Sequence, residues 1–284
     1  GHPRLFAGAP GGGRYDLIRY FDMCGGIGGL GAGLTRACGF QCVGHCEIDK
    51  YADARGTLFF ELARMVKAKR PRYLLAENVP GLLSHDHGKT FAVILSTLDD
   101  LGYHVEWAVL NSKHFGVPQS RKRVFLICYL DPRCAGEPRR TETARCLTAR
   151  YGQTTLSTHR AERSGVLLIR EPTKQGYKKA AVGDSVDLNY PGSKTRGGRV
   201  SRMAHDAVSV QGIVERGGRI RRLMPRECLR LQGFEEEQIN KILAINSDAQ
   251  AYKQAGNSVT INVVEAIGRR IRAVDEELRK EVAV

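Results

Sequence analysis

The sequence contains three groups of residues whose types and spacing could do chemistry. The first is a glycine-rich turn at residues 24–31, directly after an apolar stretch. Glycines let a backbone approach a bound ligand, and Glu47, at the end of the next predicted strand, could accept hydrogen bonds from ribose hydroxyls. Gly26, Gly28 and Gly31 also satisfy the dinucleotide pattern G-x-G-x-x-G. Two other interpretations therefore remain: an enzyme that uses a nicotinamide cofactor, and a tight turn that binds no ligand.

The second group is a single acid. Glu77 follows the aliphatic stretch 73–76, which predicts a short strand. We expect its carboxylate at the carboxyl end of a central strand, where open α/β sheets bind their ligands. There it is suited to share a proton with a substrate nitrogen. The alternative is an acid that caps a helix or forms an ion pair in the core.

The third group alternates along the chain. Gln119, Arg121 and Arg123 are two residues apart, so an extended backbone would project all three side chains to one face. Two guanidinium groups and an amide suit an anionic or planar polar ligand. A solvated basic turn is the competing interpretation.

The elements that position these groups alternate between strand and helix. This order predicts an α/β fold with a Rossmann-like, doubly wound sheet. The expected strands are 16–23, 41–48, 73–76, 105–110 and 124–129. The first expected helix follows the glycine turn and ends near residue 37, and three more are expected at 55–70, 91–101 and 259–280.

The composition restricts the class of protein. With 42% apolar and 26% charged residues, the 284-residue chain resembles a globular protein of one large or two unequal domains. Eight scattered cysteines do not form a disulfide scaffold, and no apolar run is long enough to span a bilayer. We therefore expect a soluble cytoplasmic protein that makes no membrane contact and has no metal site, with residues 1–14 as a tag or disordered leader.

The positive charge is concentrated in one region. Residues 139–230 contain 20 basic and 8 acidic residues, a net +12 out of +14 for the chain. From about residue 131 the sequence also becomes rich in Arg, Gly, Thr and Ser, which predicts a smaller, loop-rich domain. The charge favours nucleic acid as the partner, against a merely solvated basic surface.

Together these elements resemble the DNA (cytosine-5) methyltransferases that use S-adenosylmethionine. The resemblance runs from about Leu17 to Ala266. It rests on seven ordered segments: 22–29 (DMCGGIGG), 47–49 (EID), 55–60 (RGTLFF), 77–79 (ENV), 119–123 (QSRKR), 226–234 (RECLRLQGF) and 254–259 (QAGNSV). One departure is Cys24, where the family more often has Phe.

The resemblance implies the domains, the reaction and the site residues. The catalytic domain would comprise 15–133 and 246–284, and the target-recognition domain 134–245. A cysteine thiolate would add to a cytosine flipped from duplex DNA, and carbon 5 would take the methyl group. Glu77, Arg121 and Arg123 would be catalytic. The implied cofactor contacts are Met23, Cys24, Gly25, Gly26, Gly28, Gly29, Glu47, Ile48, Asn257, Ser258 and Val259, with S-adenosylhomocysteine as product. The expected DNA contacts are Lys194, Thr195, Arg196, Arg199, Arg202 and Gln119.

The resemblance breaks at the nucleophile. The family's cysteine follows a proline after the fourth strand, and this sequence has no Pro-Cys pair. The second strand runs directly into the helix that should follow the fourth, so we predict a seam within about residues 50–55 where two strands are missing. A second, weaker seam is predicted near 133–140. Either residues of a longer chain are absent from this sequence or the protein is shortened and inactive.

Three alternatives follow. The chain is a catalytically inactive DNA-binding relative, an RNA (tRNA) cytosine-5 methyltransferase of similar fold, or, remotely, a nicotinamide enzyme. The resemblance implies a bacterial or phage-type monomer that acts on double-stranded DNA. A cognate restriction endonuclease would be a functional partner.

Overall fold

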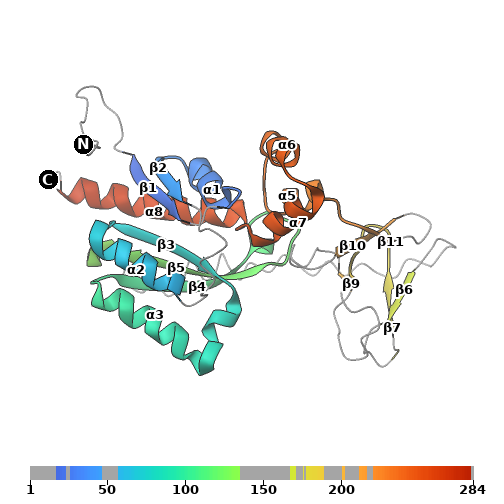
Figure 1. The fold of residues 1–284 in the computed structure, drawn as a ribbon, viewed down its shortest axis with the longest axis horizontal. Coiled ribbons are helices and arrows are strands. Elements are labelled where there is room, and N and C mark those ends of the chain that lie inside the picture. The colour runs from blue at the N-terminus through green and yellow to red at the C-terminus, as the bar shows by residue number, and fades with distance from the viewer. Residues whose placement is uncertain are drawn as a thin grey trace.

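A computed structural model describes residues 17–23, 26–46, 57–134, 167–170, 175, 177–188, 200–201, 211–215 and 220–282. Strands and helices alternate through the first half of these residues, and helices close the chain (Figure 1). No helix among the described residues is long and apolar enough to cross a membrane.

The first sheet is a parallel pair. β1 (Ile18–Met23) pairs with β2 (Phe40–Cys46), and α1 (Gly29–Ala37) connects them. Gly28 begins the helix with φ at 78°, in the left-handed region that favours glycine. α1 packs closely on α8 (Ile261–Val282), because a Cβ atom at Gly33 would lie 2.5 Å from that of Val264.

The second sheet has the order β3-β5-β4 and is antiparallel. Its strands are β3 (Tyr73–Asn78), β4 (His104–Asn111) and β5 (Lys122–Tyr129). α2 (Thr57–Lys69) and α3 (Lys89–Asp100) cover one face, through a core that includes Val66, Leu98 and Val124. The other face packs on α8, where Phe125 belongs to one hydrophobic cluster with Val263 and Ile267. Short 3-10 helices occur at Pro80–Leu83, His85–Gly88, Ser112–His114 and Pro132–Cys134.

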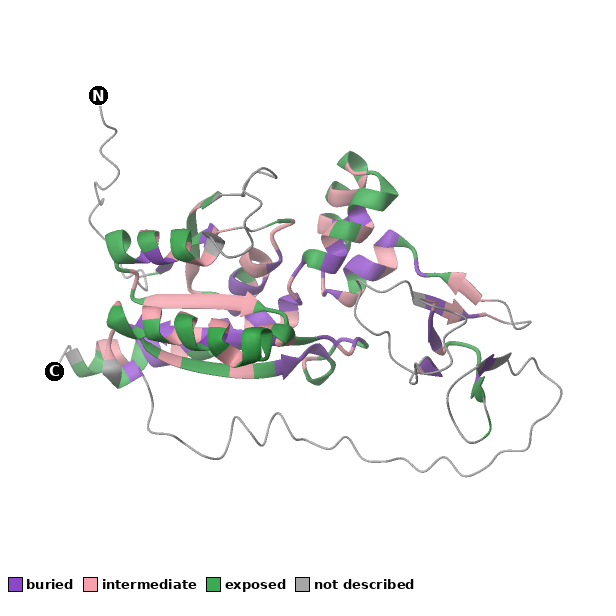
Figure 2. Ribbon diagram, turned by 60° about the horizontal axis from the view of Figure 1, so that its bottom comes forward, coloured by how far each residue is buried: buried purple, intermediate pink, exposed green. Residues whose placement is uncertain are grey.

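The expected strands and helices of this half are present, but the described strands do not form one sheet. β1 pairs with β2 and β3 pairs with β5, and no pairing among the described residues joins the two sheets. Both sheets pack on α8 (Figure 1). β3 is only partly buried along most of its length, whereas a central strand is normally covered (Figure 2). The predicted single doubly wound sheet is therefore interrupted, because the strands expected between β1 and β3 have no residues to form them.

The remaining described strands are short. β8 (Ser185–Asp187), β9 (Val200–Ser201), β10 (Gln211–Val214) and β11 (Ile220–Arg222) form one sheet, and β6 (Leu167–Arg170) pairs with β7 (Tyr177–Ala180). Three helices follow: α5 (Pro225–Leu231), α6 (Glu236–Ile245) and α7 (Asp248–Asn257). Their core includes Leu229, Ile239 and Ala255 and reaches Ile27 beside the glycine turn. These helices therefore pack onto the first half of the chain.

Candidate functional site

Glu77 and Arg123 meet as an ion pair at the ends of neighbouring strands. Glu77 lies near the carboxyl end of β3, and Arg123 lies near the start of β5, which pairs with β3. The Nε atom of Arg123 is 3.0 Å from Oε1 of Glu77. The Glu77 side chain is 25% exposed and that of Arg123 11%, so a ligand can reach the pair while the protein excludes most of the water. An acid and a guanidinium so placed can act together on a polar planar ring.

A single serine fixes the backbone before Arg123. The Oγ atom of Ser112 donates to the carbonyl oxygen of Gln119 at 2.5 Å and accepts from the backbone N–H of Arg121 at 3.1 Å. The side chain of Gln119 is fully buried. Its predicted contact with DNA stays a prediction, and it would require this side chain to become exposed. Nothing in the sequence pattern indicated the role of Ser112.

Arg121 contacts a different part of the chain from Arg123. It is only 3% exposed, and its Nη2 atom donates to the carbonyl oxygens of Gly256 and Ser258 at 2.7 and 2.8 Å. Gly256 lies in the last turn of α7, and Ser258 is the first residue after that helix. The two arginines therefore do not share one ligand-facing position. Arg121 ties the Glu77–Arg123 region to the segment that carries Asn257, Ser258 and Val259.

That segment lies against the glycine turn, although the two are far apart in sequence. A Cβ atom at Gly29 would lie 2.5 Å from Oγ of Ser258 and 2.9 Å from the carbonyl oxygen of Val259, so only glycine fits there. Gly26 and Gly28 have positive φ, and a Cβ atom at either would meet no atom within 4 Å. The turn thus offers open space and backbone N–H groups at the start of α1, which fits a ligand with a polar or charged end.

The other predicted contacts lie at the ends of elements or outside the described residues. Met23 is half-buried at the end of β1, and Asn257 is exposed at the end of α7. The remaining sites predicted for cofactor and DNA lie outside the described residues. These are Cys24, Gly25, Glu47 and Ile48 for the cofactor, and Lys194, Thr195, Arg196, Arg199 and Arg202 for DNA.

Gln232 has a positioning role that the sequence did not reveal. Its buried side-chain amide donates to the carbonyl oxygen of Ala255 at 3.0 Å and accepts from Oγ1 of Thr260 at 2.9 Å. Its own carbonyl oxygen accepts from the backbone N–H of Ile261 at 2.9 Å. It thus holds both ends of the 256–259 segment. It lies within the 226–234 motif, which marked the region without indicating this contact.

The described thiols are poorly placed to act at Glu77. Burial raises the pKa of Cys128 to about 12. Burial, and to a smaller extent the negative charge of Glu227, raises the pKa of Cys228 to about 11. Both thiols therefore stay protonated near neutral pH. Cys134 is buried as well, and it follows β5 at the opposite end of the sheet. Cys38 and Cys42 are exposed, but they lie at or on β2, which flanks the other side of β1.

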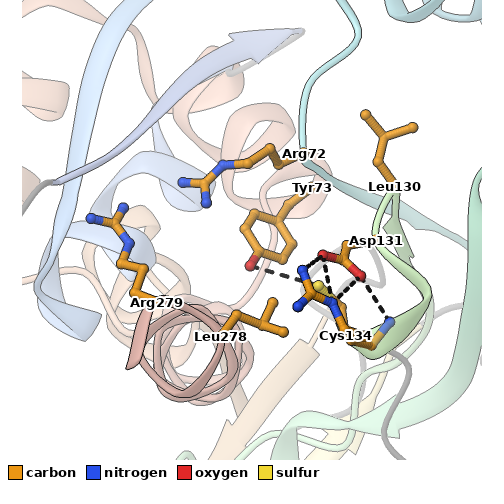
Figure 3. A pocket seen from close by; sticks show the side chains of 8 residues that line it. Arg72, Tyr73, Leu130, Asp131, Cys134, Leu278 and Arg279 are labelled. Atoms are coloured by element: carbon orange, nitrogen blue, oxygen red, sulfur yellow. Dashed lines mark hydrogen bonds and ion pairs between the residues drawn. The ribbon is translucent and has the colours of Figure 1, made fainter. Parts of the chain in front are cut away.

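A hollow of about 330 Å³ lies at the amino end of β3, away from Glu77. Tyr73, Asp131, Arg133, Cys134 and Arg279 are among its lining residues (Figure 3). Burial, followed by a hydrogen bond to Asp275, raises the pKa of Tyr73 above its usual range. Of the lining charges, Asp131 pairs with Arg133, and Arg279 pairs with the buried Asp275 outside the lining, so these charges already have partners within the protein.

Part of the positive charge of residues 139–230 is neutralised by ion pairs within the protein. Arg221 pairs with Glu227 at 2.7 Å, and Arg226 pairs with Glu236 at the same distance. Arg230 also pairs with Glu236. These three arginines are therefore weaker candidates for phosphate contacts than the predicted residues between 194 and 202.

Comparison with known proteins gives the family. A family model described as C-5 cytosine-specific DNA methylase matches residues 51–273. The chain belongs to this family. The chain is 32% identical over 249 residues to the type II methyltransferase M.SsoII of Shigella sonnei, covering 82% of the chain and 62% of that relative. It is 28% identical over 317 aligned positions to the type II methyltransferase M.HhaI of Haemophilus parahaemolyticus, and the match covers 89% of the chain and 94% of that relative.

The fold of the chain is shared with solved structures. A crystal structure of a putative DNA modification methyltransferase encoded within an Escherichia coli prophage superposes with a TM-score of 0.61. It is 16% identical in sequence, and the match covers 91% of this chain and 99% of that one.

The alignments also support a missing segment. The chain spans less than two thirds of the length of M.SsoII. The alignment with M.HhaI is 317 positions long and the chain has 284 residues, so at least 33 positions have no counterpart here. The family match begins at residue 51, which falls inside the predicted seam, although the glycine turn lies before it.

Proposed function

We propose that this chain provides the cofactor-binding and cytosine-binding parts of a DNA (cytosine-5) methyltransferase that uses S-adenosylmethionine. The observation that carries the proposal is the Glu77–Arg123 ion pair, which Arg121 connects to the segment packed on the glycine turn. A base site and a cofactor site are thereby held next to each other. The domains would be 15–133 with 246–284 for catalysis and 134–245 for target recognition, and the complete protein would have one doubly wound sheet.

The residues of this chain would bind and polarise a cytosine flipped from the duplex. S-adenosylmethionine supplies an electrophilic methyl group when it is bound. The Glu77 carboxyl group would donate a proton to ring nitrogen 3 as a thiolate adds to carbon 6, which makes carbon 5 nucleophilic. Arg123 would hold the Glu77 carboxylate and stabilise the charge that develops on the ring. Carbon 5 would take the methyl group, with S-adenosylhomocysteine as the leaving group, and loss of the carbon 5 proton would then expel the thiolate from carbon 6. Arg121 acts at a distance from the base, as a positioning residue.

Binding and catalysis need separate tests. S-adenosylhomocysteine should bind the purified chain, and Gly29→Ala should abolish this binding because the new Cβ atom would collide with Ser258 and Val259. A duplex containing 5-fluorocytosine traps a covalent adduct only if a thiol attacks the base. Cofactor binding without an adduct would support the proposed role and locate the defect at the nucleophile. Absence of cofactor binding by a folded chain would refute the proposal.

The absent nucleophile favours a second candidate, a DNA-binding relative without catalytic activity. The two candidates share the +12 segment, in which lysine and arginine would neutralise phosphates. Reversing the charge of Arg196 together with Arg199 should weaken binding to duplex DNA and reduce its dependence on salt. Arg230→Glu is the matched control, because Arg230 already pairs with Glu236. Equal binding by the double variant would refute the assignment. Methyl transfer to tRNA in place of DNA would favour the RNA enzyme.

A further inference from the structure

Three segments that are far apart in sequence meet at the side chain of Asn262. This residue is the second of α8 and is partly buried. Its Nδ2 atom donates to the carbonyl oxygen of Phe115 at 2.9 Å, and its Oδ1 atom accepts from Nη1 of Arg36 at 3.4 Å. A Cβ atom at Gly233 would lie 2.5 Å from the same Oδ1 atom, and one at Gly116 would lie 3.7 Å from Nδ2. The side chain of Asn262 therefore lies between two glycines of different segments.

Arg36 extends this junction to the turn between α5 and α6. It lies in the last turn of α1, and its Nη2 atom donates to the carbonyl oxygen of Gly233 at 2.7 Å and to the carboxylate of Glu235. Only 26% of the Arg36 side chain is exposed, so the protein shields these contacts from most of the water. α5 is in turn connected to β11 by the pair Arg221–Glu227. The junction therefore reaches the short-stranded sheet through α5.

Phe115 extends the junction to the base site. It lies in the loop between β4 and β5, and its backbone N–H donates to the carbonyl oxygen of Ser112 at 2.9 Å. The hydroxyl group of Ser112 also accepts from the backbone N–H of Arg121. Asn262 therefore holds the same loop that Ser112 connects to Arg121, next to the Glu77–Arg123 ion pair.

Both residues of the junction lie on elements that border the glycine turn. α1, which carries Arg36, begins at this turn. Asn262 comes three residues after Val259, whose carbonyl oxygen lies against Gly29. α1 and α8 also pack against each other. A ligand that orders the glycine turn and residues 256–259 would therefore order Arg36 and Asn262 as well.

We propose that Arg36 and Asn262 are positioning residues, through which occupancy of the glycine turn is felt in two other places. Arg36 positions the α5–α6 turn, and Asn262 positions the loop that contains Phe115. Ligand binding and the ordering of these two segments are then energetically coupled, although neither residue acts on the reacting atoms. The inference rests on the proposed function, because it takes S-adenosylhomocysteine as the ligand of the glycine turn.

Hydrogen exchange of the full chain, with and without saturating S-adenosylhomocysteine, tests the coupling. The reporters are the amides of Phe115 and Phe234, which donate backbone hydrogen bonds in the loop and in the α5–α6 turn. Exchange at both should slow by at least about fivefold with the ligand, because coupling between sites is typically of this size or larger. The amide of Cys134, in a short 3-10 helix at the opposite end of the sheet, should not change.

Two variants separate the two contacts. Asn262→Asp keeps the acceptor for Arg36 but places an oxygen atom against the carbonyl of Phe115. The ligand response at Phe115 should then be lost and that at Phe234 kept. Arg36→Met removes the donors to the α5–α6 turn, so the response at Phe234 should be lost and that at Phe115 kept. A role in stability alone would speed exchange in the free protein and leave both ligand responses unchanged.

Arg269→Met is the matched control, because Arg269 also lies on α8 but forms an exposed ion pair with Glu265. It should change neither response, and urea unfolding checks that every variant is folded. Three results would overturn the inference: a bound ligand that slows exchange at neither reporter, both responses kept in both variants, or both responses lost in each. A chain that does not bind S-adenosylhomocysteine refutes the proposed function and the inference with it. Binding without a response at either reporter refutes the inference alone.

Discussion

Replacing Arg121 with methionine should loosen the cofactor segment and leave the rest of the fold largely intact. Methionine keeps the aliphatic stem but removes the guanidinium, whose Nη2 atom donates to Gly256 at 2.7 Å and to Ser258 at 2.8 Å. Hydrogen bonds from a charged donor contribute about 1.5–3 kcal/mol each. Relief of a buried charge offsets part of this loss. We therefore expect the free energy of unfolding to fall by about 2–3 kcal/mol.

The loss should also appear in cofactor affinity. Gly256 and Ser258 border the segment that packs on Gly29, so part of the energy that orders this segment must come from ligand binding once Arg121 is gone. If about 1.4 kcal/mol of the loss is transferred, the dissociation constant of S-adenosylhomocysteine rises about tenfold. Titration calorimetry measures this constant, and urea unfolding with and without the ligand measures stability. Arg121→Lys keeps the charge, so its stability and its affinity for S-adenosylhomocysteine should lie between those of the unchanged protein and those of Arg121→Met.

Arg226→Met is the matched control. Arg226 donates to Glu236 at 2.7 Å and to Asn240 at 2.8 Å, but its side chain is 36% exposed. Pairs at the surface contribute about 0–1 kcal/mol, so neither stability nor affinity should change much. Unaltered ligand affinity in a destabilised Arg121→Met protein would show that Arg121 stabilises the fold without ordering the cofactor segment. Unaltered stability as well would refute the interpretation of its hydrogen bonds.

Gly29→Ala should lower the free energy of unfolding by about 1–3 kcal/mol, because its Cβ atom would lie 2.5 Å from Oγ of Ser258. Urea unfolding measures this change. Unchanged stability would mean that the glycine turn and residues 256–259 separate freely. Asp275→Ala should destabilise the protein by about 3 kcal/mol, since this buried carboxylate accepts from Tyr73 and two arginines; thermal unfolding at two scan rates checks this, and Asp275→Asn should lose less. Raising the pH from 9 to 11 should lower stability by about 2 kcal/mol through Cys228, whose pKa is raised from 9.0 to about 11. The unfolded thiol ionises first, so the loss begins above pH 9, and it should shrink in Cys228→Ala.

The sequence predicted that Glu77 and Arg123 both lie at strand ends, but it did not predict that they form an ion pair. Glu77 follows an aliphatic run, and Arg123 precedes the apolar stretch 124–129, so pairing of these strands brings the side chains together. The partners of Arg121 were not predictable in this way. Its contacts join residues 135 and 137 positions apart, and they depend on where α7 ends and α8 begins. Alternation along an extended segment placed Arg121 beside Arg123, but burial directs it to different partners.

The order of motifs predicts a seam within about residues 50–55, which lie outside the described residues, but it did not predict how the two sheets would be arranged. The two sheets keep their place because each packs on α8 and does not depend on pairing with the other: Ile18 and Phe125 belong to the same cluster with Ile267. The groups proposed to bind the cofactor and the base all lie on these elements. Under the proposed function, cofactor and base binding should therefore persist in this chain, because the groups that would provide it are held by elements that pack on α8.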